Sequence, residues 1–358
     1  MVQLDIASSF SCLLSHEVFL FPCNFYFYIL PLFCKVYKAY DLLFPFSLKN
    51  IPKKIFKTKA RIFQKMKCRK CNKKAVVNLK DYKIALCESC YPIFYEKLVE
   101  RSIKRYRIIK EKEKVLAAVS GGKDSVSMIS ALKEIQKKLN FELEVLHINL
   151  GIKGYSEKLE KIVKDVTSIL ELEFNTVELK DYGFTIDDVE IKKICSACGI
   201  SKRYLMNKTA RELNFDVVVT GHTSEDIIEF FFKNCLSGNF ELNKKLIPRI
   251  DSFDKKIVAK ARPIFDRTEK ENMLYVLCKK LPFSMDACPH APRRDWKEII
   301  YYIELKKPGF KRAFVVNLAK AMKPEFKEPF KYCMRCGEVS TSAICSFCKL
   351  TMKYAKKK

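Results

Sequence analysis

Ser120-Gly121-Gly122-Lys123-Asp124-Ser125 is the stretch of sequence that decides the fold. It follows a short apolar strand that we predict over 114–119, and it precedes a helical pattern that runs to about residue 138. In a strand, glycine turn and helix of this kind, backbone N–H groups and the helix N-terminus can hold a phosphate. The Gly-x-x-x-x-Gly-Lys spacing of a Walker A loop is absent. The motif therefore predicts a nucleotide-binding loop of another class.

Strands and helices keep alternating after this loop. We predict strands over 143–149, 174–179 and 216–220, and helices over 156–170, 196–213 and 224–235. This alternation predicts an α/β fold with a doubly wound parallel sheet. Ligands of such sheets bind at the carboxyl ends of the strands. We therefore expect Ser120, Asn149 and Gly221 to converge on one site, and the backbone of His147 and Ile148 to meet an adenine.

The loop residues carry separate expected roles. Lys123 can neutralise phosphate charge, and Asp124 can hold Mg²⁺ or position the reacting group. The two glycines let the backbone approach an anion closely. The predicted ATP-binding residues lie along the loop and at neighbouring strand ends: Ala118, Ser120, Gly121, Gly122, Lys123, Asp124, Ser125, Ile148 and Gly221.

Ten of the 16 cysteines fall into Cys-x-x-Cys pairs, a spacing that suits metal binding. Two pairs near the start and two near the end each supply four thiolates, the number that a closed tetrahedral zinc site needs. These two predicted zinc ribbons use Cys68, Cys71, Cys87 and Cys90, and Cys333, Cys336, Cys345 and Cys348. Free thiolates predict a reducing compartment, so we expect a cytoplasmic protein.

The chain is strongly basic: 68 Lys and Arg stand against 41 Asp and Glu, a formal net charge of +27. A solvated lysine surface is one interpretation, and a polyanionic partner such as RNA is the other. The segment Arg293-Arg294-Asp295-Trp296, with Tyr301 and Tyr302 nearby, mixes cations and aromatics. It predicts either RNA stacking or an amphipathic helix that packs Trp296 inside.

Residues 1–65 do not match the rest of the chain. An apolar and aromatic run over 18–34 is interrupted by two prolines and is short for a membrane span. We interpret the segment first as a mis-called upstream extension, because Met66 opens the first ribbon like a natural start. A membrane-surface anchor and a genuine packing element are the alternatives, and we expect no membrane partner.

The loop resembles the PP-loop of the N-type ATP pyrophosphatases. The segment Cys195-Ser196-Ala197-Cys198-Gly199-Ile200-Ser201-Lys202-Arg203 resembles the tRNA 2-thiolation branch of that superfamily, the TtcA/TtuA group. Two flanking ribbons are similar to TtuA-type members, and the resemblance spans about residues 66–350. It predicts an extension (1–65), an N-terminal zinc ribbon (66–100), a PP-loop catalytic domain (101–325) and a C-terminal ribbon with a basic tail (326–358).

The resemblance implies a [4Fe-4S] cluster held by Cys195, Cys198 and Cys288, with one iron left open for sulfur. From the residues alone, Cys235 and Cys278 compete for the third place, although each lies in an apolar helical context that favours core packing. A redox or persulfide pair at Cys195 and Cys198 is an alternative chemistry.

Two further positions match family residues: Lys202 matches a catalytic lysine and Asp226 a catalytic aspartate. The alternative interpretations are structural: Lys202 would be a solvated charge on a helix, and Asp226 a charge at a helix N-terminus. His222 stays open between a site residue and a capping or core residue. The sequence departs from the usual Gly-His-Asn-x-Asp-Asp pattern, because Gly-His-Thr-Ser-Glu-Asp stands at 221–226. That departure puts the role of Glu225 and the exact substrate in doubt.

The implied reaction is ATP-dependent 2-thiolation of a tRNA uridine: the C2 oxygen is adenylated and sulfur then replaces it. Sulfide or a thiocarboxylated ubiquitin-like protein is the implied sulfur donor, a homodimer is usual for the group, and uridine 34 and uridine 54 both stay open. The alternatives are another PP-loop enzyme, such as an amidotransferase or a tRNA lysidine synthetase-like ligase, and an RNA-binding zinc protein with a vestigial ATP site.

Overall fold

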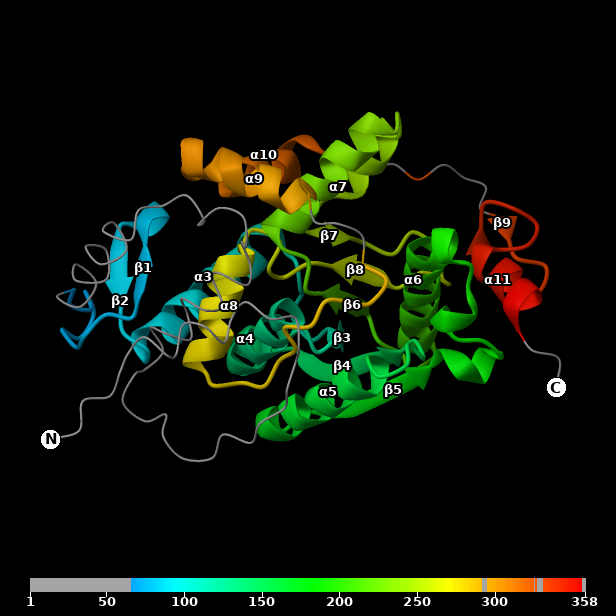
Figure 1. The fold of residues 1–358 in the computed structure, drawn as a ribbon, viewed down its shortest axis with the longest axis horizontal. Coiled ribbons are helices and arrows are strands. Elements are labelled where there is room, and N and C mark those ends of the chain that lie inside the picture. Colours follow the sequence, from blue (N-terminus) through cyan, green and yellow to red (C-terminus); the bar gives the residue numbers. More distant parts are fainter. Residues whose placement is uncertain (1–65, 292–294, 325, 327–330, 356–358) are drawn as a thin grey trace, which may run out of the picture.

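The computed structural model describes residues 66–291, 295–324, 326 and 331–355, so the predictions for 1–65, Arg293 and Arg294 lie outside the described residues. A six-stranded sheet in the order β5-β4-β3-β6-β8-β7 forms its centre (Figure 1). The strands are β3 (Lys114–Ala118), β4 (Glu142–Asn149), β5 (Phe174–Glu178), β6 (Val217–Thr220), β7 (Arg249–Ile250) and β8 (Ala259–Ala261). All neighbours pair in parallel except β7 and β8, which pair antiparallel.

Helices cover both faces of the sheet, so the predicted doubly wound α/β fold is confirmed. On one face α4 (Lys123–Leu139) packs against α3 (Cys90–Tyr106), α5 (Ser156–Leu170) and α8 (Glu269–Cys278). On the other face α6 (Ile194–Glu212) lies across β4 and β6. The antiparallel β7–β8 pair was not predicted, because strands of two and three residues leave too short an alternation to recognise.

The side chains of β6 show how both faces of the sheet are buried. Val217 and Val219 enter the core under α4, whereas Val218 packs with Ala210 of α6. Alternate residues of a strand point to opposite faces, and both faces here carry apolar residues over most of their length. That pattern fits a parallel sheet buried on both sides.

A helical hairpin covers the end of α7. Figure 1 shows α7 (Ser224–Leu236), α9 (Asp295–Lys306) and α10 (Phe310–Ala321) together at one edge of the molecule. Thr223 caps α7 in a capping box with Asp226, and Thr268 caps α8 in the same way with Glu271. Both boxes satisfy orphan N–H groups at the helix starts.

Two small cysteine-rich units lie at opposite ends of the molecule (Figure 1). The first contains the hairpin of β1 (Val77–Leu79) and β2 (Ile84–Leu86) and leads directly into α3. The second contains β9 (Lys331–Tyr332), β10 (Val339–Ser340) and α11 (Ser346–Tyr354), and α11 packs on α6. No helix of the described residues is both long enough and apolar enough to span a membrane.

Candidate active site and metal-binding sites

The PP-loop is fixed by its own hydroxyl groups. The hydroxyl of Ser125 donates to the carbonyl oxygen of Gly122 at 2.9 Å and accepts from the backbone N–H of Ser120 at 3.2 Å. Gly121 has a φ of +82°, a conformation that favours glycine. The loop therefore keeps a turned shape between β3, which ends at Ala118, and the N-terminus of α4.

The end of β6 comes very close to this loop. A Cβ atom added to Gly221 would stand 3.0 Å from the backbone N and Cα of Ser125. Glycine is needed here because backbone meets backbone. Ser120 and Gly221 are thus neighbours, as the sequence predicts. Asn149, at the end of β4, instead donates to Glu160 at 2.8 Å and accepts from Gly151 at 3.0 Å.

Lys123 and Asp124 lie in a buried network of charges. The Lys123 ammonium is 2.8 Å from Asp124 Oδ2 and 3.0 Å from Glu269 Oε2 of α8. Asn272 donates to the other oxygen of Asp124 at 2.8 Å. Burial, helped by the carboxylates of Glu269 and Asp226, raises the pKa of Asp124 to about 6 although Lys123 opposes the shift. A cluster of carboxylates beside a phosphate-binding loop is the chemistry that Mg²⁺ prefers.

Asp226 caps a helix and also faces this network. Its Oδ2 accepts from the backbone N–H of Thr223 at 2.9 Å, and its Oδ1 is 2.9 Å from the ammonium of Lys297 on α9. Lys297 also pairs with Glu269. Burial would raise the pKa of Asp226, but Lys297 and His222 hold it well below its usual range. The helix-cap interpretation is therefore correct, and the same carboxylate also belongs to the charged site.

Glu225 has a structural partner. Its carboxylate lies 2.7 Å from the ammonium of Lys311 on α10 and accepts from the backbone N–H of Glu269 at 3.2 Å. The residue that departs from the family pattern thus ties α7 to α8 and α10.

His222 lies just after the end of β6, and Lys202 lies on α6. His222 Nδ1 is 2.8 Å from the Thr220 hydroxyl, and its ring packs edge-on against Phe230. Burial and then the charge of Arg262 lower the pKa of His222 to about 4, with a further contribution from Lys202. Lys202 likewise contributes to lowering the pKa of His147, after burial. The charge of Lys202, on α6, thus acts on histidines at the ends of β4 and β6.

The loop that carries Cys288 reaches the start of α6, where Cys195 and Cys198 lie. The Cys195 sulfur is 3.5 Å from the carbonyl oxygen of His290 in this loop. Cys198 and Cys288 border the same apolar cluster. The sulfur atoms of Cys195, Cys198 and Cys288 do not all lie within 4.8 Å of one another. Among the described residues, the two ribbon sets are the only groups of three or more ligand atoms that meet this limit. Wider spacing fits a polynuclear cluster, in which each thiolate binds a different iron.

Each ribbon set fits a single tetrahedral ion. Its four sulfur atoms lie within 4.8 Å of one another, with Cys71 and Cys87 3.5 Å apart and Cys336 and Cys345 3.7 Å apart. Zn–S bonds of about 2.3 Å place tetrahedral thiolates roughly 3.8 Å apart. Backbone N–H groups also point at these sulfurs, as from Cys345 to Cys333 at 3.2 Å. The donor set and its spacing suit structural zinc.

Comparison with known proteins identifies the family. A family model described as the PP-loop domain matches residues 95–294. The chain is 37% identical over 296 residues to a tRNA-5-methyluridine(54) 2-sulfurtransferase from Pyrococcus horikoshii, covering 79% of this chain and 93% of that protein. The corresponding protein from Thermotoga maritima is 35% identical over 303 residues, with 82% and 98% covered. This chain belongs to the PP-loop family of tRNA 2-sulfurtransferases.

A solved structure shows the same fold. It is the U34-tRNA thiolase NcsA from Methanococcus maripaludis with its [4Fe-4S] cluster, which matches with a TM-score of 0.68 at 24% identity. The match covers 82% of this chain and 98% of that one. This likeness supports the predicted fold.

The remaining predicted residues of this sulfurtransferase pack in the interior or at helix contacts. Trp296 stacks on Phe232 of α7 with ring centroids 5.6 Å apart, which favours the packing interpretation over RNA stacking. Cys278 is buried at the end of α8, and Cys235 accepts from the side-chain amide of Asn243 at 3.3 Å. Cys278 belongs to a different apolar cluster from the one that Cys198 and Cys288 border, so its competing assignment gains no support.

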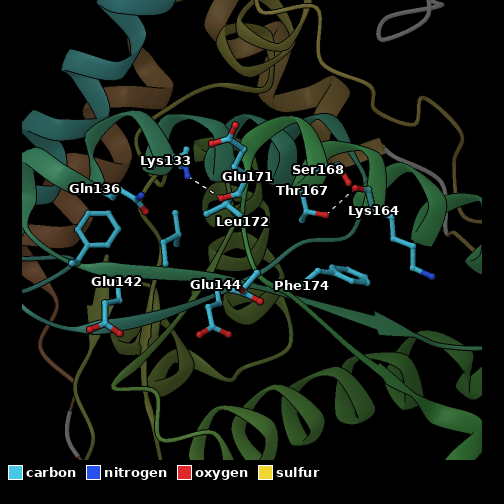
Figure 2. Close-up of a pocket in the computed structure, with 13 residues that line it drawn as sticks. Lys133, Gln136, Glu142, Glu144, Lys164, Thr167, Ser168, Glu171, Leu172 and Phe174 are labelled. Carbon is cyan, nitrogen blue, oxygen red and sulfur yellow. Dashed lines mark hydrogen bonds between the residues drawn. The ribbon is translucent and has the colours of Figure 1, made fainter.

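A broad pocket of about 850 Å³ lies away from all of these residues (Figure 2). It is bordered by Glu142 and Phe174, which begin β4 and β5, and by the last turns of α4 and α5. This is the amino edge of the sheet, whereas ligands of such folds bind at the carboxyl edge. The pocket is therefore separate from the nucleotide site.

Several residues of the site gave no usable sequence signal. Glu269 and Lys297 complete the charged network, yet no motif links them to the PP-loop. The Thr268 to Glu271 capping spacing could have indicated a helix start near the first of them, but it was not used. Contacts between segments so far apart in sequence require the fold to be known.

Proposed function

We propose that this protein thiolates C2 of uridine 54 in tRNA, with ATP split to AMP and pyrophosphate. The observation that carries the proposal is the similarity to position-54 sulfurtransferases, at 37% and 35% identity over most of both chains. Relatives described as tRNA 2-thiolation proteins, such as NcsA from Haloferax volcanii, are less similar at 27% identity. Position 34 is the competing outcome of the test below.

The PP-loop residues would bind and activate ATP. Backbone N–H groups of 120–125 and the ammonium of Lys123 suit the phosphates, and Ala118, Ile148 and Gly221 border the place of the nucleoside. Asp124, with Glu269 beside it, suits Mg²⁺. The C2 oxygen of the uridine would attack the α-phosphate, pyrophosphate would leave, and a sulfur nucleophile would then displace AMP together with that oxygen.

The cysteines beside α6 would hold the sulfur chemistry. Cys195, Cys198 and Cys288 suit a [4Fe-4S] cluster, which would supply an iron position for sulfide. Lys202, one helical turn after Cys198, would stabilise negative charge on the base or the leaving AMP, and Asp226 would orient the base or accept a proton. The place of Asp226 in the charged network beside the PP-loop and the effect of the Lys202 charge on His222 support these roles.

The ribbons and the charge of the chain support the remaining parts of the proposal. Two Zn²⁺ ions would fold residues 66–100 and 326–358 around the catalytic domain at 101–325, and the net charge of +27 suits a tRNA partner. Sulfide or a thiocarboxylated ubiquitin-like protein would donate sulfur to a cytoplasmic homodimer. A zebrafish relative that is 27% identical is described as a cytoplasmic tRNA 2-thiolation protein.

The proposal is tested with anaerobically purified protein, ATP, Mg²⁺, sulfide and tRNA transcripts, followed by mass spectrometry of the nucleosides. We expect one 2-thiouridine per tRNA and one AMP per thiolation. A transcript with cytidine at position 54 should stay unmodified, and one with cytidine at position 34 should react normally. The reverse pattern would move the assignment to position 34, and AMP formation without thiolation would overturn the function.

A further inference from the structure

Two cations at the end of β8 lack the partners that other buried cations have. Lys260 and Arg262 lie at the carboxyl end of this strand, and both are partly buried. Arg262 donates to the carbonyl oxygens of Lys245 at 3.3 Å and Ile247 at 2.5 Å, which fixes its guanidinium. In the part of the chain that the structure describes, no carboxylate pairs with either side chain.

Strand register places both cations on the face that carries α6. Lys260 pairs with Val218 of β6, and Val218 packs under α6. Arg262, two residues later, falls on the same face. Asn207 of α6 accepts from the backbone N–H of Val258 at 3.0 Å and donates to the carbonyl oxygen of Lys256 at 2.7 Å. These bonds anchor the helix beside the start of β8.

From that anchor, α6 and β8 run alongside each other toward the cysteines. Two strand residues from Val258 to Lys260 advance about 7 Å, and one turn of α6 from Asn207 back to Arg203 advances about 6 Å. Arg203 therefore lies level with Lys260. Its guanidinium folds back to within 3.1 Å of the Cβ position of Gly199, next to Cys198. We call Arg203, Lys260 and Arg262 the cationic cluster; it lies on the α6 side of the sheet, and the exposed Arg203 extends it toward Cys198.

Three other buried cations of the described residues face carboxylates. Arg267 pairs with Asp266 at 3.1 Å, Lys311 with Glu225 at 2.7 Å, and Arg249 with Glu113 at 2.7 Å. Burying Lys260 and Arg262 without a carboxylate partner is costly. Burial, Arg203 and Arg262 lower the pKa of Lys260 to about 8. An anionic ligand would remove this cost.

We propose that the cationic cluster of Arg203, Lys260 and Arg262 binds a backbone phosphate of the RNA beside the nucleotide that is modified. The inference rests on the proposed function and names where its substrate is held. A fixed Arg and a Lys suit a phosphate oxygen. Such contacts position an RNA without reading its sequence.

The arrangement of strands favours RNA over ATP as the source of the phosphate. The nucleotide-binding residues Ala118 and Ile148 belong to β3 and β4, on one side of the PP-loop. β8 lies two strands from β3 on the other side, beyond β6. Two strand spacings are about 10 Å. The side of the sheet that β8 occupies is therefore left for the tRNA, which accepts the sulfur in the proposed reaction.

The test compares Lys260→Gln with Lys137→Gln, which removes the same charge from the last turn of α4 at the opposite edge of the sheet. Binding of a tRNA transcript is measured by fluorescence anisotropy over a range of salt, and ATP binding by calorimetry. Lys260→Gln should raise the Kd for tRNA about fivefold or more and lower the slope of log K against log salt by about one. ATP affinity should stay unchanged, and Lys137→Gln should match the wild type.

The outcomes of this test distinguish RNA from ATP as the source of the bound phosphate. A loss of ATP affinity with unchanged tRNA binding would assign the cationic cluster to the nucleotide and overturn the proposal, as would equal effects of the two variants. A protein that binds tRNA through Lys260 but forms no 2-thiouridine would overturn the proposed function and leave the RNA-binding role of the cationic cluster standing. A protein that thiolates tRNA but does not need Lys260 for tRNA affinity would support the proposed function and overturn the inference about Lys260.

A second measurement needs no variant and therefore does not depend on its folding. Lysines of the wild-type protein are acylated briefly, with and without ligands, and quantified by mass spectrometry. Acylation at Lys260 should fall at least threefold with tRNA and stay unchanged with ATP, while Lys137 should react equally throughout. Protection of Lys260 by ATP alone would count against the RNA assignment.

Discussion

Gly221 sets how closely the end of β6 approaches the PP-loop. Because an added Cβ would stand 3.0 Å from the backbone of Ser125, Gly221→Ala must push the loop away from its place. We expect ATP affinity to fall at least tenfold, measured by calorimetry. Gly154→Ala is the control: it has a φ of +69° but open space around the added carbon. Equal ATP affinity in both variants would show that the close contact does not shape the loop.

Cys288 is the proposed cluster ligand that lies farthest in sequence from Cys195 and Cys198. Cys288→Ala should remove most of the iron and the absorbance near 400 nm from anaerobically purified protein, because two thiolates hold a cluster poorly. Cys235→Ala should retain both, since that thiol meets Asn243 instead. Full iron content in Cys288→Ala would refute Cys288 as the third ligand. Iron loss in Cys235→Ala alone would assign that place to Cys235.

Single residues were predictable where a short motif carries them. The PP-loop serines and the eight ribbon cysteines are each specified by spacing within one segment, and the structure places each set together. Lys297 and Lys260 were not predictable, because a lone lysine in a chain with 68 basic residues carries no signal. Their significance depends on which carboxylates the fold brings near them.

At the scale of elements, α9 is joined to the site through Lys297. This ammonium pairs with Asp226 and Glu269, and all three side chains are largely buried. Lys297→Met should destabilise the protein by about 3 kcal/mol, because two buried carboxylates lose their partner. Chemical denaturation would measure the change. Lys306→Met, in the last turn of the same helix, should change stability by no more than about 0.5 kcal/mol.

Long elements were predicted closely and short ones were not. The helix at 156–170 has the predicted bounds, and the helix predicted at 196–213 begins two residues earlier, at Ile194. β7 and β8 were missed, although β8 carries Lys260 and is followed directly by Arg262. A strand of three residues is specified by its neighbours in the sheet rather than by its own pattern.

At the scale of the whole molecule, the C-terminal ribbon is built onto α6. Tyr204 stacks on Phe347 with centroids 3.9 Å apart, and Glu338 accepts a hydrogen bond from Asn207 at 3.3 Å and pairs with Arg211. The ribbon therefore covers the helix that carries Cys195 and Cys198.

Metal loss in the ribbon should accordingly reach the cysteine site. In Cys333→Ser we expect about one zinc ion per chain instead of two, together with a lower iron content, both measured by mass spectrometry of metals. Cys71→Ser, in the other ribbon, should lose one zinc ion with no loss of iron. Equal iron content in the two variants would show that the C-terminal ribbon does not support α6.

The packing of α11 on α6 also sets an order of events during synthesis. α6 leaves the ribosome well before the segment that covers it, because residues 333–348 are made later. Until that segment has taken up its metal, the start of α6 lacks part of its apolar support. Delivery of iron to these thiols should therefore come last in biogenesis, after zinc has closed the chain around them.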